Sequence, residues 1–297
     1  MGRSYRYVVL AVSLLMLASA VQAVLAQETK NVTLENMNDP SFGQAFSLPR
    51  VWWLDDNSAL IYDSRKPDSV RVLERLDPST GKRAPLFDWT KAKESFAKLF
   101  QGGKAPRVSP VPSAFSGAGK YGLYMVGGDI FVLDIPNSSF LRVTETPEEE
   151  KSINFSPDGT KLAFVRGTNL YAVDIASKKE WQLTKDGSET LLNGTLSWVY
   201  WEEIFGRRDI GYWWSGDSKA IAYLQTDESE VSIDRFVNFE PWTPTIKTQR
   251  YPKPGEKNPA VKVGVVEVGS DQTTWASIDR NSYEYIVRVG WLPDSKQ

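Results

Sequence analysis

Short runs in which apolar and polar residues alternate make up much of the chain after residue 50. Such runs occupy residues 59–62, 161–165 and 220–224, and two further runs lie at 169–174 and 181–184. Because successive side chains of a β-strand point to opposite faces, a period of two predicts strands that bury one face. We therefore expect an all-β fold.

One kind of turn recurs between these strands. An aromatic residue ends a strand, and an Asp next to Gly, Asn or Ser then reverses the chain. Complete copies stand at residues 53–57, 155–159, 214–218 and 291–295, and a degenerate copy stands at 115–119. Several short antiparallel strands per repeat predict the blades of a β-propeller. The intervals between copies are irregular, so we expect inserted loops, and a β-sandwich is the alternative architecture.

A different period appears in residues 88–106. Trp89, Ala92 and Phe96 are spaced as on one face of an α-helix, with Lys and Glu between them, and two glycines follow. We expect a small helical insertion between strands, and its aromatic side chains should pack into the core.

Three polar features carry weaker predictions. The acids at 227–230 lack the glycine and the ligand spacing of a calcium loop, so a solvated turn is expected there. Residues 250–259 are rich in Pro, Lys and Gly, which predicts a loop. Asn-x-Ser/Thr sequons matter only if the host glycosylates exported proteins; they stand at Asn31, Asn137, Asn154 and Asn193.

Residues 1–26 have the pattern of a secretory signal peptide. Two arginines precede an apolar run at residues 8–17, small residues follow, and cleavage is expected after Ala23 or Ala26. An uncleaved signal that anchors the protein in a membrane is the alternative. The remaining chain, residues 27–297, is therefore expected to be exported to the periplasm or out of the cell.

The composition excludes several classes of function. The 297 residues include no His and no Cys, so no Ser-His-Asp or Cys-His catalysis can be completed within this chain. Thiol catalysis and zinc-finger sites are excluded for the same reason, and no Gly-x-Ser-x-Gly motif or phosphate-binding loop is present. A net charge of −2 argues against nucleic acid as a partner. We expect no metal and no cofactor.

Residues 198–208 place Glu202 and Glu203 between aromatic side chains, with Arg207 and Arg208 close behind. Carboxylates in an apolar setting need a cation, which either the arginines or an amine from outside can supply. One interpretation is a short surface helix in which Glu203 pairs with Arg207 four residues later, for a few tenths of a kcal/mol. A glycosidase-type carboxylate pair is disfavoured, because neighbouring side chains do not face each other across about 5 Å.

The same stretch resembles the double-glutamate motif of the dipeptidyl peptidase IV family. Order and spacing of further family-like segments are kept over roughly residues 150–297. These segments are residues 212–215, 221–223, 227–231, 251–259, 261–262 and 265–268. Two positions depart from the family pattern: Trp201 stands where relatives often have a third acid, and Ser197 replaces a common Asp.

The resemblance implies a function as well as a fold. It implies that residues 27–297 form an incomplete N-terminal β-propeller, on which Glu202 and Glu203 hold the free α-amino group of a peptide substrate. The parent is then an exported serine exopeptidase that releases N-terminal dipeptides. Its C-terminal α/β-hydrolase domain is missing here, so we expect a truncated chain that is inactive alone.

The partners implied are a peptide with a free amine and the missing hydrolase domain, and a homodimer is one expectation for the full-length parent. The alternative function is that of a non-catalytic exported propeller that binds peptides or proteins. That alternative gives the two glutamates no special role.

Overall fold

The computed structural model describes residues 33–38, 48–54, 56–67, 70–100, 103–117 and 119–295. The chain divides into two units, of which the first comprises residues 1–49 with 64–67 and the second comprises the rest. Helix α2 (Leu34–Met37) belongs to the first unit, and the strands below belong to the second. The predicted signal peptide lies outside the described residues. Within the described ranges, no helix is long and apolar enough to span a bilayer.

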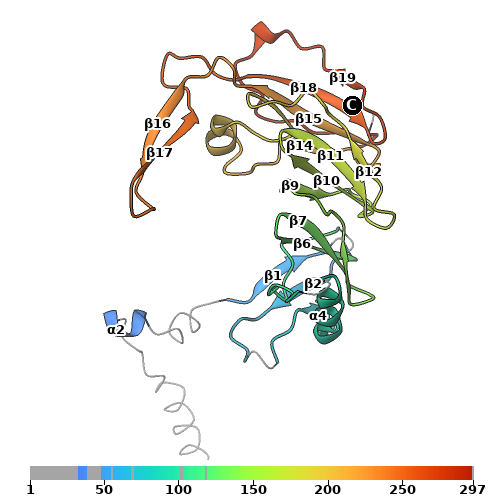
Figure 1. Cartoon of the computed structure of the whole chain (residues 1–297). Coiled ribbons are helices and arrows are strands. Elements are labelled where there is room, and N and C mark those ends of the chain that lie inside the picture. Colours follow the sequence, from blue (N-terminus) through green and yellow to red (C-terminus); the bar gives the residue numbers. More distant parts are fainter. Residues whose placement is uncertain are drawn as a thin grey trace, which may run out of the picture. The chain divides into compact units, whose positions relative to one another are not determined.

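Three sheets share one plan, in which four antiparallel strands each pair with the next along the chain (Figure 1). The first contains β1 (Arg50–Trp53), β2 (Ala59–Tyr62), β3 (Glu74–Leu76) and β4 (Arg83–Pro85). The second contains β5 (Ala114–Phe115), β6 (Tyr121–Val126), β7 (Asp129–Asp134) and β8 (Ser139–Arg142). The third contains β9 (Glu150–Phe155), β10 (Lys161–Arg166), β11 (Asn169–Asp174) and β12 (Glu180–Gln182).

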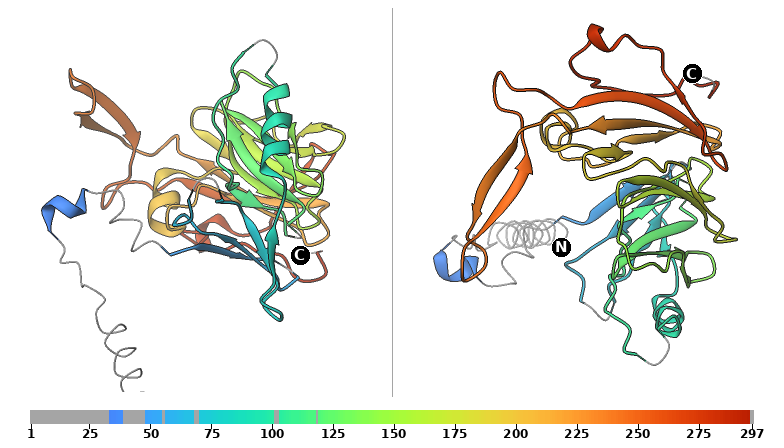
Figure 2. Two further views of the ribbon diagram at one scale, coloured as in Figure 1. Left: turned by 90° about the horizontal axis from the view of Figure 1, so that it is seen from below. Right: turned by 45° about the horizontal axis from the view of Figure 1, so that its top comes forward.

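The fourth sheet departs from this plan. Its strands follow the order β13-β15-β18-β19, and β14 also pairs with β15. These strands are β13 (Leu191–Asn193), β14 (Tyr212–Trp214), β15 (Ala220–Asp227), β18 (Ala260–Glu267) and β19 (Thr273–Trp275). Between β15 and β18 the chain forms a separate hairpin of β16 (Ile233–Asn238) and β17 (Thr245–Arg250), which extends away from the sheet (orange in Figure 2).

The all-β prediction is confirmed, since the sheets are antiparallel and the helices are few and short. The predicted runs at 59–62 and 169–174 match β2 and β11, and the runs at 161–165 and 220–224 lie within longer strands. The hairpin β16–β17 was not predicted. Most of its side chains are exposed on both faces, so its sequence lacks the alternation that marks a half-buried strand.

The recurring turn is confirmed by its backbone geometry. One residue of every copy has a left-handed backbone with φ near +60°: Asn57 (61°), Gly119 (67°), Gly159 (69°), Ser218 (60°) and Ser295 (58°). Gly and Asn adopt this region more readily than other residues. The Asp beside it caps the turn; for example, Asp158 Oδ1 accepts from the backbone N–H of Thr160 at 2.9 Å.

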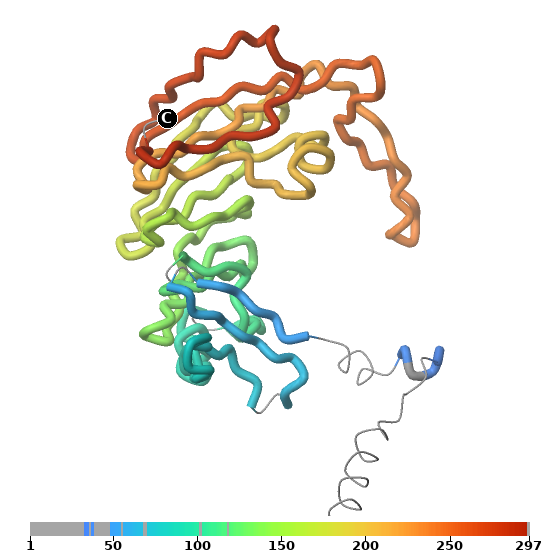
Figure 3. Tube along the Cα trace, turned by 180° about the vertical axis from the view of Figure 1, so that it is seen from behind, coloured from blue at the N-terminus to red at the C-terminus, as the bar shows by residue number. Residues whose placement is uncertain are grey.

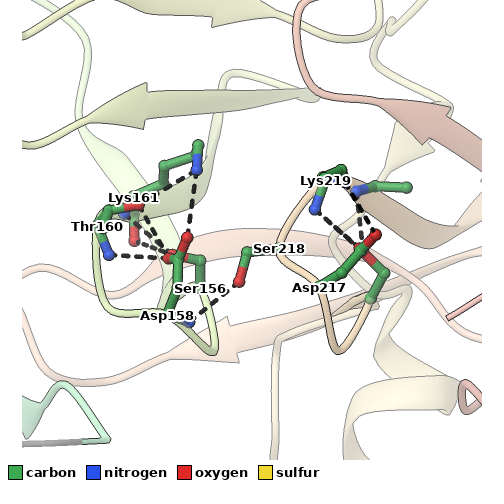
Figure 4. A network of polar contacts seen from close by, with 9 residues as sticks. Ser156, Asp158, Thr160, Lys161, Asp217, Ser218 and Lys219 are labelled. Carbon is green, nitrogen blue, oxygen red and sulfur yellow. Dashed lines mark hydrogen bonds and ion pairs between the residues drawn. The ribbon is translucent and has the colours of Figure 1, made fainter. Parts of the chain in front are cut away.

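Successive turns are also joined to one another by hydrogen bonds. The backbone N–H of Asp158 donates to Ser218 Oγ at 3.0 Å, and that of Asp217 donates to Ser295 Oγ at 3.1 Å. Figure 4 shows the first of these contacts, with Asp158 of one turn facing Ser218 of the next. The left-handed serine of each later turn therefore holds the turn before it.

Consecutive sheets lie side by side in chain order (Figure 3), and three hydrophobic cores lie between them. Each contains apolar side chains from two neighbouring sheets, so that every sheet packs against the next along the chain. The first core joins Leu60, Phe96, Phe131 and Phe140; the second joins Leu123, Ile130, Leu162 and Phe164; the third joins Leu170, Tyr212, Ile221 and Val266.

The predicted helical insertion is confirmed as α4 (Trp89–Lys98), which is shorter than residues 88–106. Asp88 caps its N-terminus by accepting from the N–H groups of Thr90 and Lys91. Phe96 is buried against Phe131 and Phe140, so the aromatic stripe packs into the core as expected.

The sequons differ in their exposure. Asn137 and Asn154 are exposed, whereas Asn31 lies outside the described residues. Asn193 is fully buried, and its amide nitrogen donates to Asp186 Oδ1 at 3.0 Å. Its role in the fold is therefore structural, and the folded chain does not present it for glycosylation.

Candidate functional site

Glu202 and Glu203 lie on a π-helix, η1 (Tyr200–Ile204), between β13 and β14. The N–H of Phe205 donates to the carbonyl of Tyr200 at 2.8 Å, which closes the wider five-residue turn. The same two residues stack their rings, with centroids 6.1 Å apart, and Tyr200 is fully buried. Burial of this aromatic pair on one face therefore favours a spacing of five residues.

The helix ends in two left-handed residues, Gly206 (φ 58°) and Arg207 (φ 63°). This reversal turns the Arg207 side chain back onto Glu202. Arg207 Nη2 donates to Glu202 Oε1 at 2.7 Å, and its Nε donates to Oε2 at 2.9 Å. The hydrogen bonds from the guanidinium lower the pKa of Glu202 and raise that of Arg207.

The alternative pairing of Glu203 with Arg207 at a spacing of four residues is wrong. Arg207 lies beyond the end of η1, and the left-handed reversal at Gly206 and Arg207 brings its guanidinium to Glu202 instead. Arg208 pairs with neither glutamate, and its Nε donates to the carbonyl of Phe205 at 3.2 Å.

Glu203 is exposed, and within the described part of the chain it has no hydrogen-bond or ion-pair partner. The Glu202 side chain is only 22% exposed. The two neighbouring carboxylates therefore differ in state. Glu202 is oriented and balanced by a guanidinium, whereas Glu203 is free to accept hydrogen bonds from a cationic group.

The segment after residue 280 forms hydrogen bonds with the π-helix and with the neighbouring strand β14. The Tyr200 hydroxyl accepts from the N–H of Ile286 at 3.0 Å, and Trp291 Nε1 donates to the carbonyl of Trp213 at 2.9 Å. The bond from Ile286 therefore connects the buried face of the π-helix, where Tyr200 lies, to a segment 86 residues further along the chain.

A hollow of about 600 Å³ lies on the arginine side of the turn. Arg207, Arg208 and Arg288 line it, together with Asp209 and apolar side chains, whereas neither glutamate does. This hollow has a positive rim, so it does not suit an ammonium group. Ser152 Oγ donates to Asp209 Oδ2 at 3.0 Å, which occupies the one acid in the lining.

The prediction for residues 227–230 is wrong in part. Asp227 ends β15, and Glu228 is half-buried instead of solvated. Burial raises the pKa of Glu228, and the positive charge of Arg250 opposes this shift. The sequence alone did not indicate that Arg250 acts on Glu228, because the two residues are 22 positions apart.

Metal ligation finds no support in the described ranges, where no three His, Cys, Asp or Glu side chains are grouped to hold an ion.

Comparisons with known proteins point to one family. A family model described as the dipeptidyl peptidase IV (DPP IV) N-terminal region matches residues 116–297, more than half of the chain. Prolyl endopeptidase FAP of Bos taurus is 24% identical over 277 residues, which are 90% of this chain and 35% of the bovine protein. A probable dipeptidyl-aminopeptidase B of Talaromyces marneffei is 35% identical over 169 residues, 50% of this chain and 19% of that protein.

Among solved structures, the crystal structure of Porphyromonas gingivalis dipeptidyl peptidase 4 is similar with a TM-score of 0.64. The two are 23% identical, over 84% of this chain and 35% of that one, so the likeness concerns the fold alone. The chain spans 35% or less of the length of each of these three proteins.

Proposed function

Because this chain belongs to the dipeptidyl peptidase IV family and matches its N-terminal region, we propose that it is the substrate-gating part of a longer, exported serine exopeptidase. In this proposal Glu202 and Glu203 hold the free α-amino group of a peptide. The observation that carries it is the contrast on η1 between an oriented carboxylate and a neighbouring free one.

The chemistry of the amine supports this assignment. A peptide α-amino group has a pKa of about 7.7–8.0 and is largely cationic at neutral pH. One carboxylate at about 4 Å attracts it by about 4 kcal/mol at an effective dielectric near 20, before desolvation. Glu203 offers that charge, and Glu202, fixed by Arg207, offers a second acceptor in a defined direction. Two acceptors determine the position of the ammonium as well as attract it.

A held amino terminus sets the distance to the reacting bond. The resemblance to the family implies that this bond lies two residues from the amine, so that dipeptides are released. The sequence contains no His, so Ser-His-Asp chemistry is assigned to an α/β-hydrolase domain of the longer protein. This chain supplies recognition, and the hydrolase domain supplies catalysis.

We further propose that the sheets are blades of an incomplete β-propeller. Support comes from three meanders of identical plan, from cores shared by successive sheets, and from one turn geometry repeated in five places.

The hairpin β16–β17 supports a homodimer of the longer protein. Large apolar side chains are exposed along it, which is typical of a surface that meets a partner. These side chains are Ile233, Phe236, Val237, Phe239, Trp242 and Ile246.

The proposal is tested with a peptide that has a free amino terminus and with its N-acetylated twin, titrated against the full chain. Acetylation removes the charge, so we expect the free-amine peptide to bind at least ten times more tightly. Glu203→Gln should abolish most of this preference, whereas Glu94→Gln, at an exposed position on α4, should leave it unchanged.

Equal binding of the two peptides would refute the role of the glutamates. If both peptides still bound the chain, the non-catalytic binding module would be the better description.

A further inference from the structure

The hollow of about 600 Å³ beside η1 has an excess of positive charge in its lining. Three arginines and a single acid line it: Arg207, Arg208, Arg288 and Asp209. Glu202 balances Arg207, and Asp209 can balance at most one of the other two arginines. One guanidinium therefore remains in excess here, although the chain as a whole has a net charge of −2.

The Arg208 guanidinium is anchored through one nitrogen and free at the other two. Its Nε donates to the carbonyl of Phe205 at 3.2 Å, and Phe205 lines the same hollow. Among the described residues, neither terminal nitrogen of Arg208 has an acceptor. A guanidinium with free terminal N–H groups presents the planar fork that matches a carboxylate.

Arg288 lies in a short segment that is hydrogen-bonded on both sides of it. Before it, the N–H of Ile286 donates to the Tyr200 hydroxyl at 3.0 Å. After it, Trp291 Nε1 donates to the carbonyl of Trp213 at 2.9 Å. The Arg288 side chain itself is exposed and has no hydrogen-bond or ion-pair partner within the described ranges. The backbone thus fixes where this cation joins the lining, and its donors remain available to a ligand.

Much of the remaining lining is apolar. Its apolar side chains are Ile204, Phe205, Ile210, Trp213, Val287 and Val289. Apolar walls with a few charged groups are typical of sites for organic ligands. A volume of about 600 Å³ also far exceeds the roughly 30 Å³ that one water molecule occupies in the liquid. The hollow therefore suits an anion that carries an apolar part better than a small inorganic ion.

We propose that this hollow binds a carboxylate of a peptide, either from an acidic side chain or from a free C-terminus. Arg208 and Arg288, which are 80 positions apart in sequence, donate to it. The carbon atoms next to the carboxylate pack on the apolar walls.

The choice of a peptide as the ligand rests on the proposed function, whereas the site itself goes beyond that function. It recognises a negative group instead of the amino terminus, and neither Glu202 nor Glu203 lines it. Ile204 and Phe205, which do line it, directly follow Glu203. The two sites therefore lie on the same turn of the chain.

The test uses three N-acetylated peptides, each titrated against the full chain. The neutral reference has a glutamine and a C-terminal amide. The second peptide replaces this glutamine with glutamate, and the third has a free C-terminal carboxylate instead of the amide. We expect at least one charged peptide to bind about five times more tightly than the reference, as for a partly exposed ion pair. The peptide that does so identifies the source of the carboxylate.

Acetylation leaves the proposed α-amine site unfilled, so a negative result would leave that proposal untouched. Variants then locate the effect in the hollow. Arg288→Glu should abolish the preference for the charged peptide, and Arg208→Met should reduce it. Arg83→Glu, at an exposed position on β4, and Glu203→Gln should leave it unchanged. Thermal unfolding of each variant verifies that the fold is intact.

Equal affinity for all three peptides, or no binding of any of them, would overturn the proposal. A carboxylate preference that survives Arg288→Glu in a folded protein would overturn it as well. Loss of the preference in Arg83→Glu to the same extent would also overturn it, since the effect would then be one of overall charge and not of this hollow.

Discussion

At the scale of single residues, neighbouring charged groups in this chain are in very different states. Glu150 is 1% exposed and accepts from Arg166 Nε at 2.9 Å, and Arg166 also binds Glu180 through both terminal nitrogens. Asp56 pairs with Arg75 on the open surface. A buried carboxylate depends on its cation far more than an exposed one does.

We therefore expect Arg166→Met to lower the free energy of unfolding by about 3–5 kcal/mol, because Glu150 then remains buried without its cation. Arg75→Met, which removes the exposed pair, should cost at most about 1 kcal/mol. Chemical denaturation of the two variants measures the difference. Similar losses would mean that Glu150 does not depend on Arg166.

Glu228 gives a pH-dependent prediction. Burial raises its pKa above the ordinary value of 4.5, so the folded chain binds this proton more tightly than the unfolded chain does. The stabilisation is present below pH 4.5 and is lost as the pH rises through the folded value. Glu228→Gln should therefore unfold at a higher temperature than the unmodified chain at pH 7, and the gap should close below about pH 4.

Asp77 provides the contrast of opposite sign. Hydrogen bonds from Ser79 and Thr80 lower its pKa to about 2, so its stabilisation is present above the ordinary value and lost as the pH falls. Asp77→Asn should thus unfold at a lower temperature than the unmodified chain at pH 7, with a gap that closes toward pH 2. Melting curves from pH 3 to pH 8 that ran in parallel for all three proteins would contradict both assignments.

At the scale of elements, the turns determine how one sheet meets the next. Ser218 is 1% exposed, adopts a left-handed backbone, and accepts from the N–H of Asp158 in the preceding sheet. Its hydroxyl therefore stabilises the fold through a hydrogen bond, whereas its left-handed backbone destabilises the fold through strain.

Replacement of Ser218 separates the two effects. Ser218→Ala loses the hydrogen bond and keeps the left-handed backbone, so it should cost about 0.5–1.5 kcal/mol. Ser218→Gly loses the same bond but relieves roughly 1 kcal/mol of backbone strain, so its effect on the free energy of unfolding should be close to zero. Equilibrium unfolding compares them, and equal stability of the Ala and Gly variants would contradict this account of the turn.

The turns could be predicted from sequence because each is determined by neighbouring residues, whereas the π-helix could not be. Asp next to Gly, Asn or Ser marks a left-handed turn by itself, as at Gly159 and Ser218. The wider spacing of η1 follows from the stacking of Tyr200 on Phe205, which a helix of ordinary period would separate. For this reason the double glutamate was found from sequence, whereas its pairing with Arg207 was not.

The hollow of about 270 Å³ beside Ser197 and Glu228 could not be predicted either, because residues far apart in sequence line it. Ser197 and Glu228 are 31 positions apart, and nothing in the sequence around either residue distinguishes it from other polar residues. Only the fold brings them into one lining.

At the scale of the whole molecule, the exposed hairpin is the feature that bears on association. Trp242 and Phe239 are 102% and 77% exposed, and both lie in the loop between β16 and β17. Exposed aromatic side chains on a projecting hairpin favour self-association.

We expect the full chain to self-associate, and the double replacement Phe239→Ser with Trp242→Ser to shift it toward the monomer. Val51→Ser, at an exposed apolar position on β1, serves as the control and should leave association unchanged. Sedimentation velocity over a range of concentrations measures this. A chain that is monomeric throughout, or a double variant that associates as before, would show that the hairpin does not mediate contact.

The central claim is that Glu203 and the charge of a peptide's amino terminus act on each other. A thermodynamic cycle over the unmodified chain and Glu203→Gln, each with the free-amine peptide and its acetylated twin, measures this coupling directly. A hydrogen bond between charged groups predicts a coupling free energy of about 1.5–3 kcal/mol. A coupling within error of zero, with both proteins folded, would contradict the account.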